Sequence, residues 1–338
     1  MESLFKIGFR SFLESSYIDF IEYGNHFIFP DYQFSVQLVP AFFSPELEDR
    51  LPRNSGTDFH NPPLSISDLT ISDTVLFQTK KVENKTKAEE ENLLWKTEGN
   101  VGSEDKVFLF EDRWWAAREM VQERILARLE RFRSVFARKC KVISGRGNPQ
   151  FGEAIKEFLK KNHTYSSAKC RYRYALEYEG EIVAVATFSE GRPMVRKVSD
   201  MLKNVPKEEQ PGEEIVIFDS YEWVRYASLP GIRVAGGMGK LLNAFIEERY
   251  TRLQPGTPME IMTYSDTEWS NGDVYTKLGF QYAGERPPVE YHVNKKSYIR
   301  YQQRLYEKEL AQGASPDDFY TIHNLGSKKF LLQITPEA

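Results

Sequence analysis

The sequence has few cysteines and lacks any long apolar run. Cys140 and Cys170 are the only two in 338 residues, which is too few for a disulfide framework or a cysteine-based metal site. Both have Lys or Arg neighbours, which lower thiol pKa values, although ordinary thiols in a reducing compartment are the simpler interpretation. No stretch approaches 18 uninterrupted apolar residues, so we expect no membrane-spanning helix and no membrane partner.

Targeting signals are also missing from the first 16 residues. They contain Glu2 and Glu14 and have no apolar segment of the secretory type, and transit peptides avoid acidic residues. We therefore expect an intracellular protein in a reducing compartment. That compartment is the cytoplasm or, if a transit peptide is absent from this chain, an organelle matrix or stroma.

The formal net charge of -4 conceals an uneven distribution. Residues 1–130 hold 14 Lys and Arg against 23 Asp and Glu, whereas residues 131–338 hold 31 against 26. Charge asymmetry of this kind accompanies nucleic-acid binding in some proteins and a difference between two domains in others. The basic C-terminal half is therefore a candidate surface for DNA or RNA.

Composition and periodicity predict two domains. Residues 1–135 combine a helix over 5–23, a hairpin around Pro30-Asp31 and a strand at 106–110 that runs into a helix over 111–133. Polar and charged residues at about 46–105 predict flexible insertions. Residues 136–338 form the second domain, in which strands alternate with helices.

Strands and helices alternate clearly after Cys140. The pattern predicts a helix at 152–161, a hairpin of strands 172–178 and 182–188, and further strands at 214–218, 221–226 and 259–264. It also predicts a polar loop at 198–212, helices at 240–250 and 273–278, a basic helix at 298–310, and strand-rich segments at the end of the chain.

A glycine-rich turn opens the predicted helix at 240–250. The run Gly236-Gly237-Met238-Gly239-Lys240 follows a strand, and backbone N–H groups at a helix N-terminus bind anions. A P-loop is excluded because its first glycine position is Val234 and Leu241 follows Lys240. A dinucleotide fingerprint is excluded by spacing and context. The alternative is that these glycines only permit close packing of helix and strand.

This turn resembles the pyrophosphate loop of the GNAT N-acyltransferases, whose pattern is Gln/Arg-x-x-Gly-x-Gly/Ala. Gly237 and Gly239 match the glycine positions, whereas Val234 occupies the Gln/Arg position and Arg233 precedes it by one residue. Downstream, Tyr275-Thr-Lys-Leu-Gly-Phe resembles the family's Tyr-x-Lys-x-Gly-Phe element. The resemblance covers about residues 140–338 and implies an α+β fold, a mixed sheet flanked by helices.

A narrower resemblance is to phage GNAT-like proteins, which include the Mom DNA-modification protein and domains attached to endonucleases. Thr263-Tyr-Ser-Asp266 and Gly272-Asp-Val-Tyr275 are similar to their Tyr-Ala/Ser-Asp…Gly-x-x-Tyr signature. In those proteins the preceding region resembles an α/β nuclease. Here the equivalent hairpin contains only one acid, Asp31, with Gln37 where a metal ligand is needed. Residues 1–135 therefore resemble a nuclease remnant without a metal site.

The resemblance implies acyl transfer from acetyl-CoA or a related acyl-CoA to an amine. Arg233 and the backbone of residues 236–240 would bind the cofactor, and a splayed strand at 221–226 would supply an oxyanion donor. Tyr275 would act as general acid, and Asp266 or Glu222 as base. Each has a structural alternative: packing of the Tyr275 ring, helix capping by Asp266, and an ion pair of Glu222 with Arg225. His163 is similar to a histidine of the phage group, with a structural role as its alternative.

Three functions follow from these observations. The first is an N-acyltransferase acting on nucleic acid or a nucleic-acid-associated substrate. The second is a catalytically inactive GNAT-fold protein that binds DNA or RNA or serves as a subunit of a larger nucleoprotein complex. The third is an acyltransferase for a small molecule. Binding of acyl-CoA separates the second from the other two.

Overall fold

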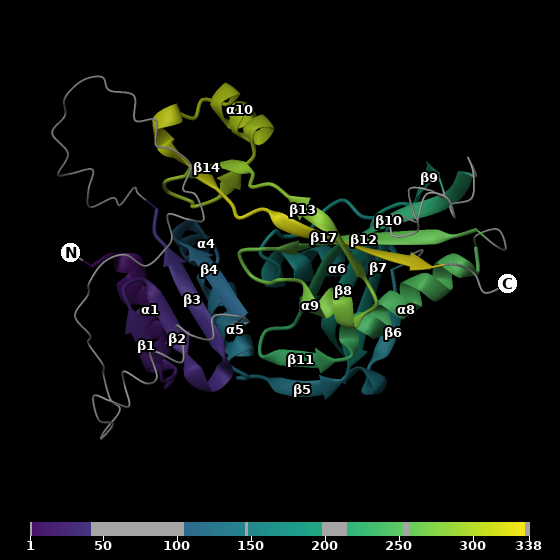
Figure 1. Cartoon of the computed structure of the whole chain (residues 1–338), viewed down its shortest axis with the longest axis horizontal. Helices are drawn as coiled ribbons and strands as arrows, with labels where there is room; N and C mark the ends of the chain where they lie inside the picture. Colours follow the sequence, from purple (N-terminus) through teal and green to yellow (C-terminus); the bar gives the residue numbers. More distant parts are fainter. Residues whose placement is uncertain (1, 42–104, 146–147, 198–214, 253–256, 335–338) are drawn as a thin grey trace, which may run out of the picture. The chain divides into compact units, whose positions relative to one another are not determined.

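A computed structural model describes residues 2–41, 105–145, 148–197, 215–252 and 257–334 (Figure 1). Their helices and mixed sheets make an α+β structure, as predicted. Two compact units are present: unit 1 comprises Met1–Gln122, Asp266–Asn271 and Pro287–Ser327, and unit 2 comprises Glu123–Ser265, Gly272–Arg286 and Lys328–Ala338. The predicted insertions at 46–105, Asp105 apart, and the predicted loop at 198–212 lie outside the described residues.

Both units are discontinuous in sequence. Buried contacts explain why residues beyond 265 return to unit 1, because Arg300 forms ion pairs with Asp112 and Glu268. The predicted division into domains 1–135 and 136–338 is continuous and so differs from this grouping. That those two segments are separate domains stays a prediction.

Unit 1 begins with a helix packed on a four-stranded sheet. Helix α1 (Leu4–Ser15) buries Phe5, Phe9, Phe12 and Leu13, which recur at helical spacing, and it ends earlier than predicted. The sheet has the order β1 (Ile21–Tyr23), β2 (His26–Phe29), β3 (Phe34–Val39), β4 (Asp105–Phe110). The predicted hairpin is the antiparallel pair β2–β3, and β3–β4 is parallel. The nuclease resemblance stays a prediction.

The helix predicted over 111–133 is wrong as a single element. Helix α4 (Glu111–Ala116) ends at Ala117, whose φ and ψ of -148° and 46° are not helical, and α5 (Arg118–Arg128) follows. The break lets the fully buried Trp114 pack against the aromatic residues of α1, with the ring centroid of Phe9 at 5.6 Å. Aromatic packing therefore outweighs the helical periodicity of this segment.

The remainder of unit 1 is a small sheet with one helix. Its strands have the order β15 (Arg300–Tyr301), β14 (Glu290–Asn294), β16 (Phe319–His323). Helix α10 (Gln303–Ala311), shorter than the predicted 298–310, carries Tyr306, whose ring stacks on His292 of β14 at 3.8 Å.

Unit 2 is built on an eight-stranded sheet. Seven strands have the order β13-β17-β12-β10-β8-β7-β6, and β9 pairs with β10. Most neighbouring pairs for which the register is known are antiparallel, whereas β10 and β12 are parallel. The bounds are β6 Lys141–Ser144, β7 Tyr172–Tyr178, β8 Glu181–Phe188, β9 Arg192–Lys197, β10 Ile215–Ser228, β12 Met259–Asp266, β13 Gln281–Arg286 and β17 Ser327–Ile334.

Helices α6 (Pro149–Asn162) and α8 (Gly237–Tyr250) cover opposite faces of this sheet. Tyr174 and Leu176 of β7 belong to the core that contains Phe245 of α8, whereas Ala175 between them packs with Ile155 of α6. Successive side chains of a strand point to opposite faces. The predicted helices at 152–161 and 240–250 and the predicted hairpin at 172–188 are confirmed.

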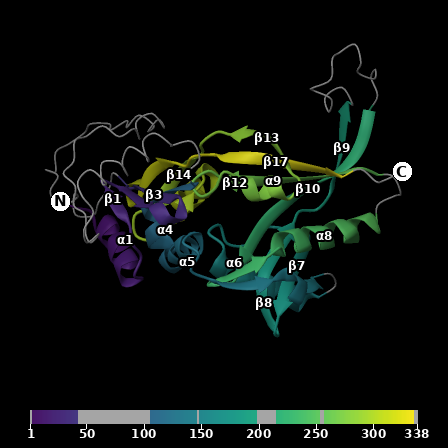
Figure 2. The same cartoon turned by 60° about the horizontal axis from the view of Figure 1, so that its bottom comes forward.

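Strand β10 (Ile215–Ser228) corrects one prediction from the sequence. The strands predicted at 214–218 and 221–226 are one continuous 14-residue strand. Figure 2 shows β9 and the first half of β10 projecting together from the sheet, where Val195 pairs with Ile217. The smaller elements of unit 2 are β5 (Arg133–Phe136) parallel to β11 (Ile232–Ala235), the turn Ala137–Lys139 and helix α9 (Asp273–Lys277).

Candidate functional site

Strands β10 and β12 separate in the middle of the sheet. Their parallel register covers four pairs and ends at Glu222 and Met262, although the strands continue to Ser228 and Asp266. At the next position Thr263 Oγ1 donates a hydrogen bond to the carbonyl of Trp223 at 3.3 Å. A side chain thus replaces the backbone ladder where the strands diverge.

A β-bulge lies at the same position of β10. The antiparallel register with β8 passes from Trp223 to Arg225 and omits Val224. A bulge leaves its extra residue outside the ladder. The strand predicted to splay at 221–226 therefore carries both the strand separation and an irregular backbone that can present N–H groups.

The glycine-rich turn forms the N-terminus of α8. Gly236 is the N-cap, with φ of 76°, a left-handed conformation that favours glycine, and no side chain caps the helix. The first helical hydrogen bond in this turn runs from Lys240 N to Gly236 O. The N–H groups of Gly237, Met238 and Gly239 are therefore the uncapped first-turn donors that an anion could bind.

Neighbouring side chains of unit 2 leave no room for a side chain at Gly237. A Cβ at this position would lie 3.0 Å from Tyr226 Oη and from Val234 Cβ. A Cβ at Gly239 would lie 3.3 Å from Leu278 Cδ2, the flexible end of a side chain. Close packing thus explains Gly237, whereas Gly236 serves the turn.

The two basic residues predicted at the cofactor site have other partners in the structure. The Arg233 guanidinium lies 5.2 Å from the centroid of the Phe132 ring, and Arg233 is exposed on the strand that buries Val234. Lys240 Nζ donates to the carbonyls of Ala137, at 3.0 Å, and Cys140, at 2.6 Å. The donors left at this turn are therefore backbone N–H groups.

Tyr275 lies where the strands separate. Its ring packs on Trp223 (6.1 Å between centroids), Phe280 (5.7 Å) and Phe330 (5.5 Å). Burial raises the pKa of Tyr275, and a hydrogen bond with Thr263 lowers it in part. The hydroxyl is therefore protonated at neutral pH and lies beside the residue that bridges to Trp223.

Glu222 occupies the last register pair before the separation. Its backbone N–H donates to Ser189 Oγ at 2.8 Å, and its side chain is partly exposed. Arg225 hydrogen-bonds backbone carbonyls, with Nη1 on Val224 O at 2.8 Å, while Glu222 also interacts with it electrostatically. Glu222 therefore lies where the strands begin to separate, and its side chain is partly exposed.

Asp266 has a turn-forming role in the structure. It ends β12, its Oδ1 accepts from Glu268 N at 3.0 Å, and its carbonyl accepts from Trp269 N at 3.0 Å. These are the contacts of an Asx turn. Glu222 and Tyr275 belong to unit 2, whereas Asp266 belongs to unit 1.

The other residues singled out from the sequence, Cys140, Cys170 and His163, have contacts that explain them without a catalytic role. Burial raises the pKa of the Cys140 and Cys170 thiols, so neither is an activated nucleophile. His163 caps α6, and its Nδ1 accepts from Tyr165 N at 3.1 Å. No cluster of His, Cys, Asp and Glu suited to a metal ion occurs within the described residues.

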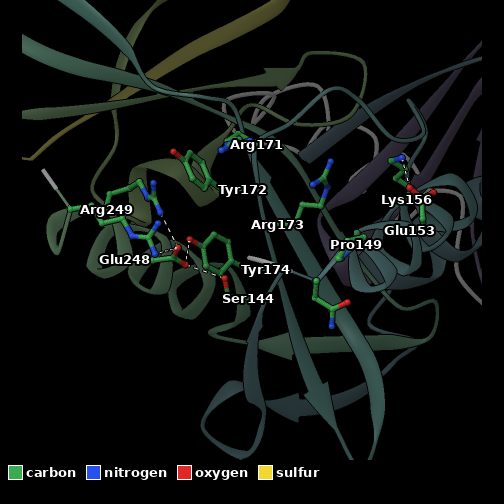
Figure 3. Close-up of a pocket in the computed structure, with 14 residues that line it drawn as sticks. Ser144, Pro149, Glu153, Lys156, Arg171, Tyr172, Arg173, Tyr174, Glu248 and Arg249 are labelled. Carbon is green, nitrogen blue, oxygen red and sulfur yellow. Dashed lines mark hydrogen bonds and ion pairs between the residues drawn. The ribbon is translucent and has the colours of Figure 1, made fainter.

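Sequence reasoning missed Trp223, Tyr226, Thr263 and Val224. Apolar alternation predicts Trp223 and Tyr226 only as strand residues, and no sequence pattern reveals a bulge or the end of a parallel register. A second feature was also missed: a pocket of about 460 Å³ at the other end of α8, lined by residues of unit 2 that include Arg173 and Arg249 (Figure 3).

Comparisons with known proteins give structural neighbours alone. No protein-family model and no curated protein matches the sequence, and within the described residues no helix is long and apolar enough to cross a membrane. The neighbours are acetyltransferases. A GNAT family acetyltransferase from Elizabethkingia anophelis with acetyl-CoA bound is 12% identical, with a TM-score of 0.29, 58% of this chain and 99% of that chain covered.

Two further neighbours give similar values. Arabidopsis thaliana NAA60 in complex with acetyl-CoA is 11% identical, with a TM-score of 0.29 and coverage of 57% of this chain and 100% of that chain. A histone acetyltransferase HPA2 and related acetyltransferase from Corynebacterium glutamicum is 16% identical, with a TM-score of 0.25 and coverage of 60% and 81%. TM-scores of this size do not establish a common fold. The function of this chain is therefore argued below from its own strand order and from the turn at the start of α8.

Proposed function

We propose that unit 2 is a GNAT-like N-acyltransferase that uses acetyl-CoA or a related acyl-CoA. The observation that carries this proposal is the separation of two parallel strands after Glu222 and Met262, followed in the chain by an uncapped, glycine-rich helix N-terminus. A parallel pair that diverges gives an extended thioester access to a strand edge, and the helix N-terminus favours its pyrophosphate.

The residues present fit such a cofactor through backbone donors. The N–H groups of Gly237, Met238 and Gly239 would hold the pyrophosphate, because no side chain caps them. The Gln/Arg position of the family pattern is filled by the buried Val234, so no guanidinium supplements them. We therefore expect weaker cofactor binding than a loop with that side chain would give.

The reaction transfers an acyl group from the thioester to an amine. Glu222 would accept a proton from the attacking amine, and backbone N–H groups at the bulge around Val224 would donate to the carbonyl oxygen as it gains charge. Tyr275, protonated because burial raises its pKa, would give a proton to the departing sulfur. The products are an amide and the free thiol of CoA.

Asp266 and Lys240 are the weaker candidates from the sequence. Asp266 hydrogen-bonds the turn that follows it, and Lys240 bonds two carbonyls through its ammonium group. We assign the base to Glu222 for this reason. Arg233 would contribute to cofactor binding only after leaving the Phe132 ring.

The proposal is tested by calorimetric titration with acetyl-CoA. We expect saturable heat with the unaltered protein and none with Gly239→Asp, which places a carboxylate in the first turn of α8. Gly231→Asp is the matched control. It adds the same charge in the loop before β11, no atom lies within 4 Å of the Cβ position, and Asp tolerates the left-handed φ of 68° better than most residues do.

Absence of heat at millimolar acetyl-CoA would contradict the proposal. That result would favour the alternative, an inactive protein of this fold that binds nucleic acid or acts as a subunit of a nucleoprotein complex. For the active protein, we propose an amine on nucleic acid as the first acceptor to test, on the basis of the phage resemblance. A salt-dependent gel shift then separates it from a small-molecule acceptor.

A further inference from the structure

Strands β5 and β11 form a two-stranded parallel sheet in unit 2, in which they lie side by side (Figure 1). Val135 of β5 pairs with Val234 of β11, and both belong to the hydrophobic core of unit 2. Successive side chains of a strand point to opposite faces, so Ser134, Phe136 and Arg233 lie on the outer face of this sheet. Ser134 and Arg233 are exposed, and Phe136 is 49% exposed. The outer face is therefore accessible from solvent.

Two arginine–phenylalanine pairs belong to this outer face. The guanidinium carbon of Arg138 lies 4.9 Å from the centroid of the Phe136 ring, and that of Arg233 lies 5.2 Å from the centroid of the Phe132 ring. Both distances are within the range of cation–π attraction. We call these four residues and Ser134 the β5–β11 platform. It presents aromatic rings and planar guanidinium groups, and nucleic-acid bases stack on both.

Positive charge surrounds the β5–β11 platform. Residues 131–144 contain five Lys and Arg and no Asp or Glu, and residues 232–246 contain two Lys and Arg and again no acid. Arg133 pairs with Glu179 at 3.8 Å, whereas Arg138 and Arg233 have no ion pair within the described residues. The positive charge is therefore local, because the whole chain has a net charge of -4.

Rings and cations together favour one kind of polyanion. Any basic surface attracts phosphate groups, but an aromatic ring adds affinity only where the face of a base is free to stack on it. In a duplex the faces of the bases are already stacked on one another, and an acidic peptide has no bases. Proteins that bind single strands combine a positively charged surface with aromatic side chains, and the β5–β11 platform has both.

We propose that the β5–β11 platform binds single-stranded nucleic acid. Bases would stack on Phe132 and Phe136 or on the guanidinium groups beside them, and the N–H groups of Arg138 and Arg233 would donate to phosphate oxygens. Three residues separate Phe132 from Phe136, so each pair would contact a different nucleotide. Stacking accepts every base, and binding should therefore show little sequence preference.

The test is a fluorescence-anisotropy titration of the full chain with a labelled single-stranded thymidine oligonucleotide at a series of salt concentrations. Phe132→Leu and Phe136→Leu should each weaken binding about tenfold without changing its salt dependence, because a stacking ring is lost but no charge. Arg138→Gln and Arg233→Gln should each weaken binding and lower the slope of log K against log salt by about 0.7, the value for one phosphate contact on a single strand.

Two substitutions elsewhere in unit 2 are the matched controls. Tyr282→Leu removes an exposed ring from β13, and Arg192→Gln removes an exposed charge from β9. Each should change the affinity less than about twofold, well below the effect of a lost stacking contact. An abasic strand with the same number of phosphates should bind at least about tenfold more weakly than the thymidine strand, because it keeps the charge and lacks the bases. An unchanged urea midpoint shows that each variant is folded.

Three results would overturn the proposal. They are the absence of oligonucleotide binding at low salt, platform variants that bind as tightly as the two controls, and a duplex, an abasic strand or an oligoglutamate peptide that binds as tightly as the thymidine strand. The inference rests on the platform and not on acyl transfer, although β11 ends immediately before Gly236. Oligonucleotide binding by a protein that gives no heat with acetyl-CoA would support the platform and contradict only the acyltransferase proposal.

Discussion

Thr263 Oγ1 hydrogen-bonds the carbonyl of Trp223 at the first position beyond the last register pair of β10 and β12. The bond satisfies a carbonyl that the ladder no longer reaches. It also brings Tyr275 to the point of separation, because Tyr275 packs on Trp223 and hydrogen-bonds with Thr263. Tyr275, the proposed general acid, is therefore held at the place where β10 and β12 diverge.

Tyr275→Phe should lower kcat by about 10²- to 10⁴-fold, as expected for loss of a general acid, with little change in acetyl-CoA affinity. The ring remains to pack on Trp223 and Phe280. Because burial raises the pKa of Tyr275, the activity of the unaltered protein should decline only above the ordinary tyrosine range near pH 10. Tyr282→Phe, at an exposed ring, is the control. Steady-state kinetics with equal rates for both variants would remove Tyr275 from the mechanism.

Gly237→Ala should destabilise the protein by about 1–3 kcal/mol, the range for overpacking. Its Cβ would lie 3.0 Å from Tyr226 Oη and Val234 Cβ. Gly239→Ala should cost less, because the nearest atom, Leu278 Cδ2, can move. Urea unfolding measures both values. Adding Tyr226→Phe to Gly237→Ala should recover part of the loss, and no recovery would show that the hydroxyl is not the crowding atom.

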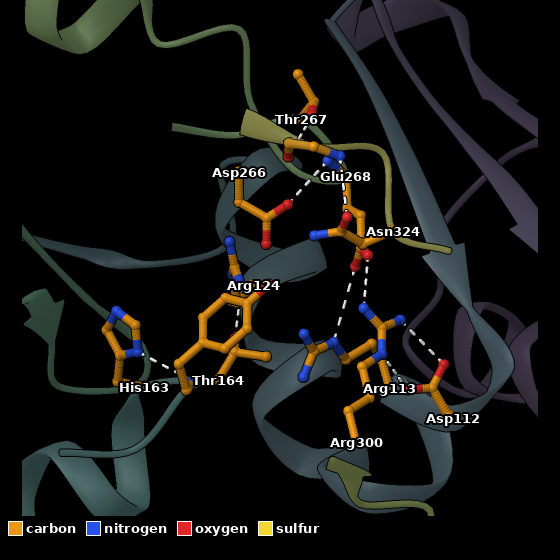
Figure 4. A network of polar contacts seen from close by, with 12 residues as sticks. Asp112, Arg113, Arg124, His163, Thr164, Asp266, Thr267, Glu268, Arg300 and Asn324 are labelled. Atoms are coloured by element: carbon orange, nitrogen blue, oxygen red, sulfur yellow. Dashed lines mark hydrogen bonds and ion pairs between the residues drawn. The ribbon is translucent and has the colours of Figure 1, made fainter. Parts of the chain in front are cut away.

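Arg300→Met should destabilise unit 1 by about 3–5 kcal/mol, because it leaves the buried Asp112 without the cation that pairs with it and leaves Glu268 with only Arg113, at 3.7 Å. Arg300 Nε lies 2.5 Å from Asp112 Oδ2 and Nη1 lies 2.6 Å from Glu268 Oε1, in the network of Figure 4. Arg304→Met, on the exposed face of α10, is the control. Equal unfolding midpoints in urea for the two variants would contradict this role for Arg300.

His26 should make the stability of unit 1 depend on pH between about 6.5 and 4. Burial, with a contribution from Lys106, lowers the pKa of His26 to about 4. In that window the unfolded chain binds a proton that the folded chain excludes, so stability falls as pH falls, by up to about 3 kcal/mol.

Urea unfolding at a series of pH values tests the His26 prediction. His26→Phe should flatten the dependence between pH 6.5 and 4, and the partly exposed His323→Gln should preserve it. A dependence that persists in His26→Phe would assign the acid sensitivity of this window to other groups.

Local features were predictable from the sequence. The β7–β8 hairpin follows from alternation on both sides of Glu179-Gly180, where φ values of 53° and 83° require turn residues. The start of α8 follows from its glycines. Two parts of the proposed site, residues 236–239 and Tyr275, were also identified from the sequence, because each belongs to a short motif of consecutive residues.

Features that depend on distant segments were not predictable. A splayed strand at 221–226 was expected only from the family resemblance. Alternation itself reports which face a residue occupies but not its partner, so it could not predict that β10 would pair with β12 for four residues. Likewise, β17 lies between β12 and β13, and Arg300 ion-pairs with Asp112 across 188 positions. Periodicity depends on residues that are close in the sequence. It cannot predict these contacts, because they join residues that are far apart in the sequence.

The sequence by itself determined the scarcity of cysteine, the uneven charge, the main strands and helices and the glycine-rich turn, because each depends on composition or on a few consecutive residues. The tertiary structure alone decided that Lys240 binds backbone carbonyls, that β10 and β12 share only four register pairs, and that Arg300 meets Asp112 and Glu268. Charge and burial act through space, so their consequences appear only when the folded chain brings those side chains together.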